Sequence, residues 1–191
     1  MHVIRVKGYT ATRIEDVCEE AGLTKGSFFH HFKSKEELAT AAADHWSAVT
    51  GGLFSSAPYR ELSDPLDRVL AYVDFRKAML RGRPLPDFTF LVGTMVQEVY
   101  DTNPLIREAC NRSISGHAAT VEADIAEAMQ KYGIVADWTA QSLALYTQAT
   151  VRERSFLPRP RAAPRSQPRV SITCTGILRC CSLNPIPGEF S

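Results

Sequence analysis

The sequence contains no apolar run of about 18 residues, the length that a membrane-spanning helix requires. Residues 1–7 also lack the apolar stretch of a secretory signal. We therefore expect a cytoplasmic protein with no membrane partner. The five cysteines include no CxxC spacing, and their odd number argues against both a disulfide framework and a zinc site. No metal site is predicted.

Catalytic machinery is missing as well. The sequence offers no nucleophile with an adjacent base, no metal-ligand set and no glycine-rich phosphate loop. We therefore predict that the protein is not an enzyme and has neither catalytic residues nor a cofactor. No segment alternates between apolar and polar residues as a half-buried strand does. The predicted fold class is all-α.

The first third of the chain has the spacing of amphipathic helices. From Ile14 to Ala21, apolar residues recur at positions i, i+3, i+4 and i+7, and Gly22 follows where a helix commonly ends. Thr12, with Glu15 three residues later, has the spacing of a capping box. The pattern predicts one helix that begins after Thr12 and ends at Gly22.

Two more helices are predicted directly after the first. Thr24 is expected to cap a second, short helix, and Ser34 a third that runs to Trp46. The turn at residues 20–24 has the length found in a helix-turn-helix, with Leu23 expected to fill the corner between the helices. In this motif the second helix enters the major groove of DNA.

Charge is distributed as DNA binding would require. Between Thr24 and Lys35 there are three lysines and no acid, whereas the flanking helices hold all seven acids of the first 46 residues. The positive charge therefore lies where a phosphate backbone would run. The alternative is that these lysines are ordinary solvated surface. Double-stranded DNA is the partner that this pattern predicts.

Residues 8–38 resemble the signature of the TetR/AcrR family of transcriptional regulators almost throughout. The most specific part is the contiguous segment VCEEAGLTKGSFFHHFKSKEEL at residues 17–38. The segment DTNPLIR at residues 101–107 is similar to one found in the regulatory domains of this family, and is less specific. Together the resemblance covers roughly residues 1–150.

The resemblance implies a set of DNA-binding residues. Thr12 and Lys35 would anchor phosphates at the two ends of the motif, and the residues that open the second helix would enter the groove. Phe29 stands where the family usually has a phosphate-contacting tyrosine, and the two histidines after it would replace part of that contact. The predicted DNA-binding residues are Thr12, Arg13, Thr24, Lys25, Gly26, Ser27, Phe29, His30, His31 and Lys35.

The resemblance also implies a small-molecule effector bound between the helices of a second domain. The mostly apolar stretch from Asp87 to Tyr100 predicts a central helix that lines the effector site. A helix that merely packs in a core would have the same composition. The effector is expected to be a small apolar or aromatic molecule. The predicted ligand-contacting residues are Phe88, Phe90, Leu91, Thr94, Met95, Gln97 and Tyr100.

Caps and breaks indicate the remaining helices. Pro65 and Pro104 each stand at the first position of a predicted helix, and the second of these helices should end at Gly133. Asp137 is expected to cap a last helix that continues through Thr150. Breaks are expected at residues 51–52 and 57–58, and a loop at residues 81–86.

The two ends depart from the family pattern. Residues 1–7 resemble only the last turns of the family's first helix. We therefore expect an incomplete first helix and a less stable DNA-reading head, the name used here for residues 1–46. Residues 151–191 carry seven arginines, no lysine and two glutamates, a net charge of +5, against −4 for residues 1–150. We favour a frame slip in the gene as the origin of this Pro/Arg-rich tail. The alternative is a genuine disordered arm that adds phosphate affinity.

These observations predict a helix-turn-helix domain at residues 1–46, a helical regulatory and dimerisation domain at 47–150, and the tail at 151–191. The predicted function is that of a repressor which binds a palindromic operator as a homodimer and is released by a small apolar effector. The expectation of a homodimer is in doubt, because the family's final helix is lost from this tail. The alternative is a truncated regulator fragment that cannot form the dimer.

Overall fold

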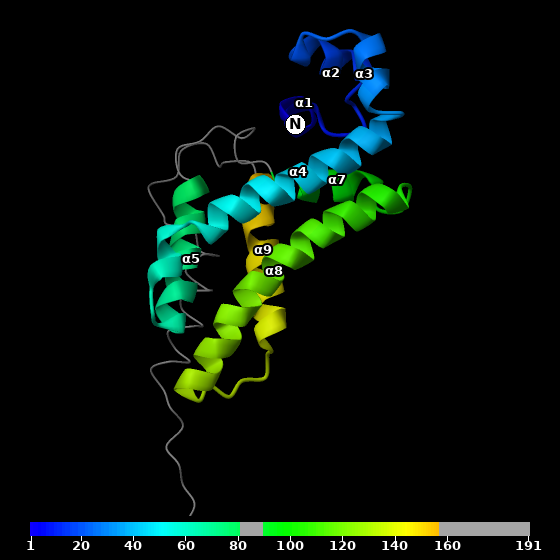
Figure 1. Ribbon diagram of the computed structural model, residues 1–191. Helices are drawn as coiled ribbons and strands as arrows, with labels where there is room; N and C mark the ends of the chain where they lie inside the picture. Colours follow the sequence, from blue (N-terminus) through cyan, green and yellow to red (C-terminus); the bar gives the residue numbers. More distant parts are fainter. Residues whose placement is uncertain (81–89, 157–191) are drawn as a thin grey trace, which may run out of the picture. The chain divides into compact units, whose positions relative to one another are not determined.

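The structure is a computed structural model that describes residues 1–80 and 90–156 (Figure 1). Within these residues every regular element is helical, which confirms the predicted all-α class. The chain divides into two compact units. Unit 1 comprises α1 to α4, α7 and α8 as far as His117, and unit 2 comprises η1, α5, α8 from Ala118 and α9.

Unit 1 begins with three short helices that lie beside the start of a long one (Figure 1). The helix end predicted at Gly22 is confirmed. Gly22 ends α2 in the left-handed conformation at φ 65°, and the N–H of Leu23 donates to the carbonyl of Cys18 over 2.8 Å. The helices of unit 1 are α1 (His2–Lys7), α2 (Ile14–Ala21), α3 (Lys25–His31), α4 (Lys35–Ser55), α7 (Leu91–Val99) and the first half of α8 (Pro104–Tyr132).

Side chains cap α3 and α4 as the sequence predicts. The Thr24 hydroxyl accepts from the N–H of Ser27 over 3.2 Å, and the Ser34 hydroxyl accepts from the N–H of Glu37 over the same distance. Each cap satisfies a donor that the first turn of a helix leaves without an intrahelical partner. The helix-turn-helix therefore has the local structure that its sequence encodes.

The predicted capping box of α2 and the predicted corner residue are both wrong. The helix begins at Ile14, and its N-cap is Arg13, whose N–H donates to the Asp16 carboxylate over 2.8 Å. Glu15 is not the cap partner, because the N-cap lies one residue later than predicted and the third helical residue is then Asp16; Glu15 instead forms an ion pair with Lys25. Leu23 is 53% exposed and does not fill the corner, whereas Phe28 of the following helix is buried.

The predicted break at Gly51–Gly52 is also wrong, because α4 continues without interruption to Ser55. Glycine lowers helix stability by only about 1 kcal/mol relative to alanine. Phe54, just beyond the two glycines, packs in a tilted arrangement against His117 with ring centroids 4.3 Å apart, a contact that favours the helical path. The predicted domain boundary at residue 46 consequently lies inside this helix.

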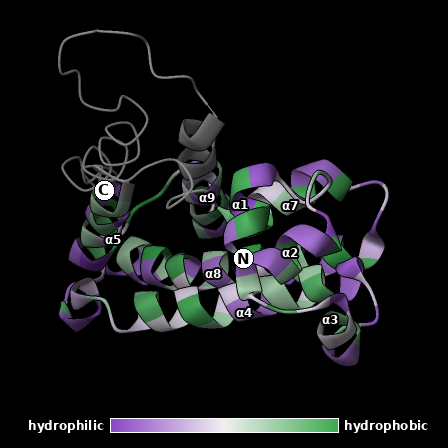
Figure 2. Ribbon diagram, turned by 90° about the horizontal axis from the view of Figure 1, so that it is seen from above, coloured by the Kyte–Doolittle hydropathy of each residue, from purple (hydrophilic) through white to green (hydrophobic). Residues whose placement is uncertain are grey.

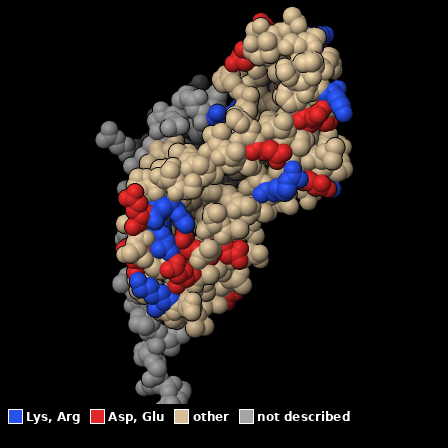
Figure 3. All heavy atoms as spheres, in the orientation of Figure 1, with Lys and Arg blue, Asp and Glu red and all other residues tan. Residues whose placement is uncertain are grey.

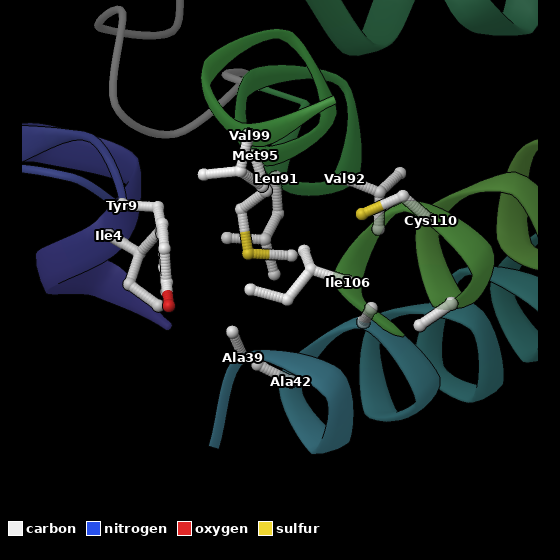
Figure 4. Close-up of a cluster of buried hydrophobic side chains, with 12 residues drawn as sticks. Ile4, Tyr9, Ala39, Ala42, Leu91, Val92, Met95, Val99, Ile106 and Cys110 are labelled. Atoms are coloured by element: carbon white, nitrogen blue, oxygen red, sulfur yellow. The ribbon is translucent and has the colours of Figure 1, made fainter. Parts of the chain in front are cut away.

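The core of unit 1 lies between α1, α4, α7 and α8 (Figure 4). Leu91 and Met95 of α7 and Ile106 of α8 are completely buried at its centre. Small side chains such as Ala39 allow α4 to approach them closely, which maintains the dense packing that protein interiors require. The first helix and α7 lie side by side (Figure 2), so α7 is part of the unit that carries the helix-turn-helix.

Tyr9 joins this core although it belongs to the loop after α1. Its side chain is 5% exposed, and its hydroxyl donates to the Glu36 carboxylate over 3.4 Å. Burial, and secondly the negative charge of Glu36, raise the pKa of Tyr9 to about 12. The ring is therefore fixed in the head in its neutral form.

Unit 2 contains η1 (Pro58–Glu61), α5 (Pro65–Leu80), the second half of α8 and α9 (Ala140–Phe156). The predicted helix starts at Pro65 and Pro104, and the stop at Gly133, are confirmed. The last helix begins later than predicted, because the cap is Thr139, whose hydroxyl accepts from the N–H of Ser142 over 3.0 Å.

Ion pairs connect α5 and η1 to the second half of α8. Asp124 is 7% exposed and accepts from Arg68 over 3.0 Å and also from Arg60. Lys131 pairs with Asp64 over 2.7 Å, and this contact holds the pKa of the Asp64 carboxyl well below its usual range. Figure 3 shows acidic and basic side chains interleaved over this part of unit 2. Pairing with arginine offsets the energetic cost of burying the Asp124 carboxylate.

Two predicted segments lie at the edge of the described residues. Phe90 has an extended backbone and serves as the N-cap of α7, so the helix predicted from Asp87 starts no earlier than Leu91. The predicted loop at residues 81–86 and nearly all of the 151–191 tail lie outside the described residues. The last helix reaches Phe156, six residues beyond the predicted Thr150.

The buried hydroxyl of Tyr9 predicts a loss of stability at alkaline pH. Its pKa is higher in the folded chain than the ordinary value of 10.0, so the folded chain keeps this proton to higher pH. The resulting stabilisation is complete below about pH 10 and is lost as the pH rises towards about 12. Between these pH values, the unfolding free energy of the Tyr9→Phe variant should decrease less steeply with pH than that of the unmodified chain. Urea unfolding at a series of pH values measures both. Equal slopes for the two chains would contradict this prediction.

Candidate nucleic-acid interface

The third helix has one buried and one exposed side. Phe28 is 5% exposed and contacts the rings of Phe29 and Phe32, with centroids 5.3 and 5.7 Å away. Lys25, Gly26, Phe29 and His30, which recur at the spacing of one helix face, are all exposed. His31 is exposed and Ser27 half-buried beside them. Phe28 thus anchors α3 to the head and leaves the predicted recognition residues accessible.

Lys25 is already paired in the absence of DNA. Its ammonium forms an ion pair with Glu15 of α2, and that contact lowers the pKa of the Glu15 carboxyl. Both side chains are more than half exposed, so solvent screens the pair and its contribution to stability is small. A phosphate could replace Glu15 as the partner of Lys25 at little energetic cost.

Gly26 occupies an open position. A Cβ atom built there would have the Thr24 hydroxyl oxygen, at 3.7 Å, as its nearest neighbour, which is ordinary van der Waals contact. The backbone is helical, so no positive φ requires glycine here. The structure of the free chain thus gives no steric reason for glycine, and a close approach by a ligand would supply one.

Lys35 binds the protein's own backbone. Its ammonium donates to the carbonyls of Tyr9, Thr10 and Thr12 over 3.1, 3.4 and 2.9 Å, and lies 4.4 Å from the centroid of the Tyr9 ring. These contacts connect the start of α4 to residues 8–13, which we call the head loop. The role implied by the resemblance, a phosphate contact, stays a prediction.

Thr12 also faces the interior of the head. The side chain is 1% exposed, and its hydroxyl donates to the carbonyl of Gly8 over 2.6 Å. Arg13 and Thr24, by contrast, are exposed. The structure therefore brings Thr12 and Lys35 together at the head loop, apart from the exposed side of α3 on which most of the other predicted DNA-binding residues lie.

Glu98, on α7, also contacts the head loop, and its role is not evident from the sequence. One carboxylate oxygen accepts from the N–H of Tyr9 over 3.1 Å and the other from the N–H of Thr10 over 2.7 Å. Glu98 is separated from the loop by about 90 residues. No local pattern could have identified it, because an isolated exposed glutamate on a helix is an ordinary surface residue.

The predicted effector-contacting residues do not share one environment. Leu91 and Met95 are completely buried in the core of unit 1, and Phe90 packs edge-on against Trp46 with centroids 5.9 Å apart. Thr94 is half-buried and donates to the Phe90 carbonyl, whereas Gln97 and Tyr100 are exposed. Phe88 lies outside the described residues.

Other kinds of site find no support in the described part of the chain. No group of three or more histidine, cysteine, aspartate or glutamate side chains among these residues is placed to hold a metal ion. None of the helices described is both long and apolar enough to span a membrane.

Comparison with known proteins places the head in a family. Residues 1–42 match the model of the bacterial regulatory proteins of the tetR family. An uncharacterised HTH-type transcriptional regulator of Bacillus subtilis, YerO, is 45% identical over 44 residues, which are 23% of this chain and 15% of that protein. The chain therefore spans only a small part of the length of this curated relative.

Solved structures extend the likeness to the rest of the fold. A transcriptional regulator from Saccharomonospora viridis in complex with choline has a TM-score of 0.73 at 20% identity, over 93% of this chain and 90% of that one. AibR in complex with isovaleryl coenzyme A and operator DNA has a TM-score of 0.64 at 17% identity, with the same coverage. The match to the tetR family of bacterial regulatory proteins thus covers residues 1–42, and the likeness to these two solved structures shows that the fold is shared over most of the chain.

Proposed function

We propose that the protein is a transcriptional regulator that binds duplex DNA through the exposed side of α3. The observation that carries this proposal is the arrangement of α3, anchored by the buried Phe28 and open along Lys25, Gly26, Phe29 and His30. Amine, imidazole and aromatic groups on one helix face can contact phosphates and base edges in a major groove. Residues 1–46 form the DNA-reading domain in this proposal.

The proposed DNA-bound form is a homodimer on a palindromic operator. A single recognition helix contacts only a few base pairs, and two heads related by a twofold axis read two half-sites. Leu145 and Tyr146 of α9 are 45% and 41% exposed, which leaves apolar surface for a second copy of the chain. The competing proposal is a regulator fragment that stays monomeric and cannot occupy both half-sites.

We further propose that a small apolar effector binds the helical part formed by residues 47–150 and releases the DNA, as in a repressor. Support for a small-molecule effector comes from the two structures described above, one of which contains choline and the other isovaleryl coenzyme A together with operator DNA. Both of those ligands are charged, so the apolar character proposed here rests on the composition of α7 alone. Among the described residues, the predicted contacts that are not completely buried are Phe90, Thr94, Gln97 and Tyr100. Contact with Leu91 or Met95 would require the core of unit 1 to open.

Selection of DNA by the full chain tests this function. We expect a random duplex library to yield an inverted repeat with half-sites about 10 base pairs apart, bound by a dimer in sedimentation equilibrium. Compounds from a small apolar library that release the duplex would identify the effector class. If no sequence is enriched and the chain sediments as a monomer, the regulator proposal is wrong and the fragment proposal is correct.

Gly26→Ala separates DNA contact from folding. A methyl group fits at this position in the free chain, and alanine favours a helix over glycine, so stability should be unchanged or rise slightly. Affinity for the selected duplex should nevertheless fall by about tenfold, since the methyl group would meet the DNA. Gly51→Ala, at an equally open position in α4, is the control and should leave affinity unchanged. Unchanged affinity in the Gly26 variant would argue against α3 as the reading helix.

Lys35→Ala tests whether this lysine stabilises the head or only contacts phosphate. Because the ammonium donates to three backbone carbonyls of the head loop, its loss should lower the unfolding free energy by about 1–2 kcal/mol. Lys33→Ala is the control, because the Lys33 side chain is exposed. Chemical unfolding of both variants measures the difference. Equal stability of the two variants would favour the phosphate contact alone.

A further inference from the structure

The contact between Glu98 and the head loop has a specific geometry. Its two carboxylate oxygens each accept one backbone N–H, from the adjacent residues Tyr9 and Thr10. Hydrogen bonds to an ionised acceptor are roughly twice as strong as neutral ones. Glutamine could not reproduce this pairing, because its amide group offers one oxygen and replaces the other with a donor that would face an N–H.

Gly8 provides a second, independent observation of this contact. It ends α1 with φ 83°, a conformation that other residues rarely adopt. A Cβ atom at this position would lie 2.6 Å from one carboxylate oxygen of Glu98 and 3.3 Å from the other. The backbone of the loop thus makes room for the carboxylate, and any side chain at residue 8 would displace it.

Lys35 completes the environment of the loop from α4. The carbonyls of Tyr9, Thr10 and Thr12 accept from its ammonium, while the N–H groups of Tyr9 and Thr10 donate to Glu98. An anion from α7 and a cation from α4 therefore hold a short segment that contains no regular structure of its own. Arg13, at the end of this segment, is the N-cap of α2, the first helix of the helix-turn-helix.

We propose that Glu98 is a positioning residue for DNA binding. By holding the N–H groups of the head loop against α7, it fixes the start of α2 and through it the presentation of α3. In this proposal Glu98 acts through the loop and makes no DNA contact of its own, so loss of the carboxylate lowers DNA affinity by disturbing the loop. This inference rests on the proposed DNA-binding function and adds to it a residue outside the helix-turn-helix.

Hydrogen exchange of the full chain tests the contact without DNA. Glu98→Gln should speed exchange of the Tyr9 and Thr10 amides by about tenfold, because one hydrogen bond is lost and the other weakened. Glu108→Gln removes the same charge from an exposed position on α8 and should leave both amides unchanged. Unchanged exchange in the Glu98 variant would overturn the proposal, whatever the DNA result.

Affinity for the selected duplex tests the consequence. At a temperature at which every variant remains folded by circular dichroism, we expect Glu98→Gln to weaken binding by about tenfold and Glu108→Gln to have no effect. A purely structural role would lower the unfolding temperature and leave this affinity unchanged, and that outcome would overturn the proposal. Failure of the proposed function is distinguishable, since the unmodified chain would then select no duplex at all.

A double-mutant cycle with Gly8→Ala measures the coupling. In the native background the new methyl group displaces the Glu98 carboxylate and also strains the backbone. In the Glu98→Ala background only the backbone strain remains, so the substitution should cost less stability and less affinity. Equal costs in both backgrounds would show that Gly8 and Glu98 act independently, which would contradict the proposed geometry.

Discussion

The arrangement of unit 1 depends on opposite charges on the two sides of the head loop. Its N–H groups donate to Glu98 of α7 and its carbonyls accept from Lys35 of α4. A six-residue segment without helix or strand has backbone groups that must find partners elsewhere, and here charged side chains supply them. The helix-turn-helix is thereby joined to two helices that lie outside it. The position of α3 is consequently a property of the whole unit, and not of residues 14–31 alone.

The head itself could be predicted from its sequence because its determinants are local. Thr24 and Ser34 cap α3 and α4, Gly22 ends α2, and each acts on residues no more than five positions away. The local pattern was misleading at the start of α2, where two neighbouring acidic residues could each complete a capping box. Asp16, and not Glu15, completes the box of α2, because the N-cap is Arg13 and not Thr12. The identity of the cap partner therefore followed from a one-residue shift in where the helix begins.

Residues whose roles depend on tertiary contacts could not be predicted. Glu98 has the appearance of a surface glutamate until α7 is placed against α1. The apolar pattern of α7 was correctly identified as helical, but composition could not tell core from ligand site, and Leu91 and Met95 lie in the core. Gly51 and Gly52 were interpreted as a break, although packing of Phe54 on His117 favours continuation of α4. In each case the deciding partner is more than 50 residues away or on another helix.

In the function proposed above, α7 is the element that would connect effector response to DNA binding. The helix is nine residues long, and its buried side chains occupy the centre of the core that also contains Ile4 and Tyr9 of the head. Close-packed interiors deform little, so a displacement of α7 is passed to its neighbours as a shift of whole elements. Glu98 is at the end of α7 nearest the head loop, where such a shift would change hydrogen-bond lengths directly. An effector that displaced α7 would therefore alter how α3 is presented without contacting α3.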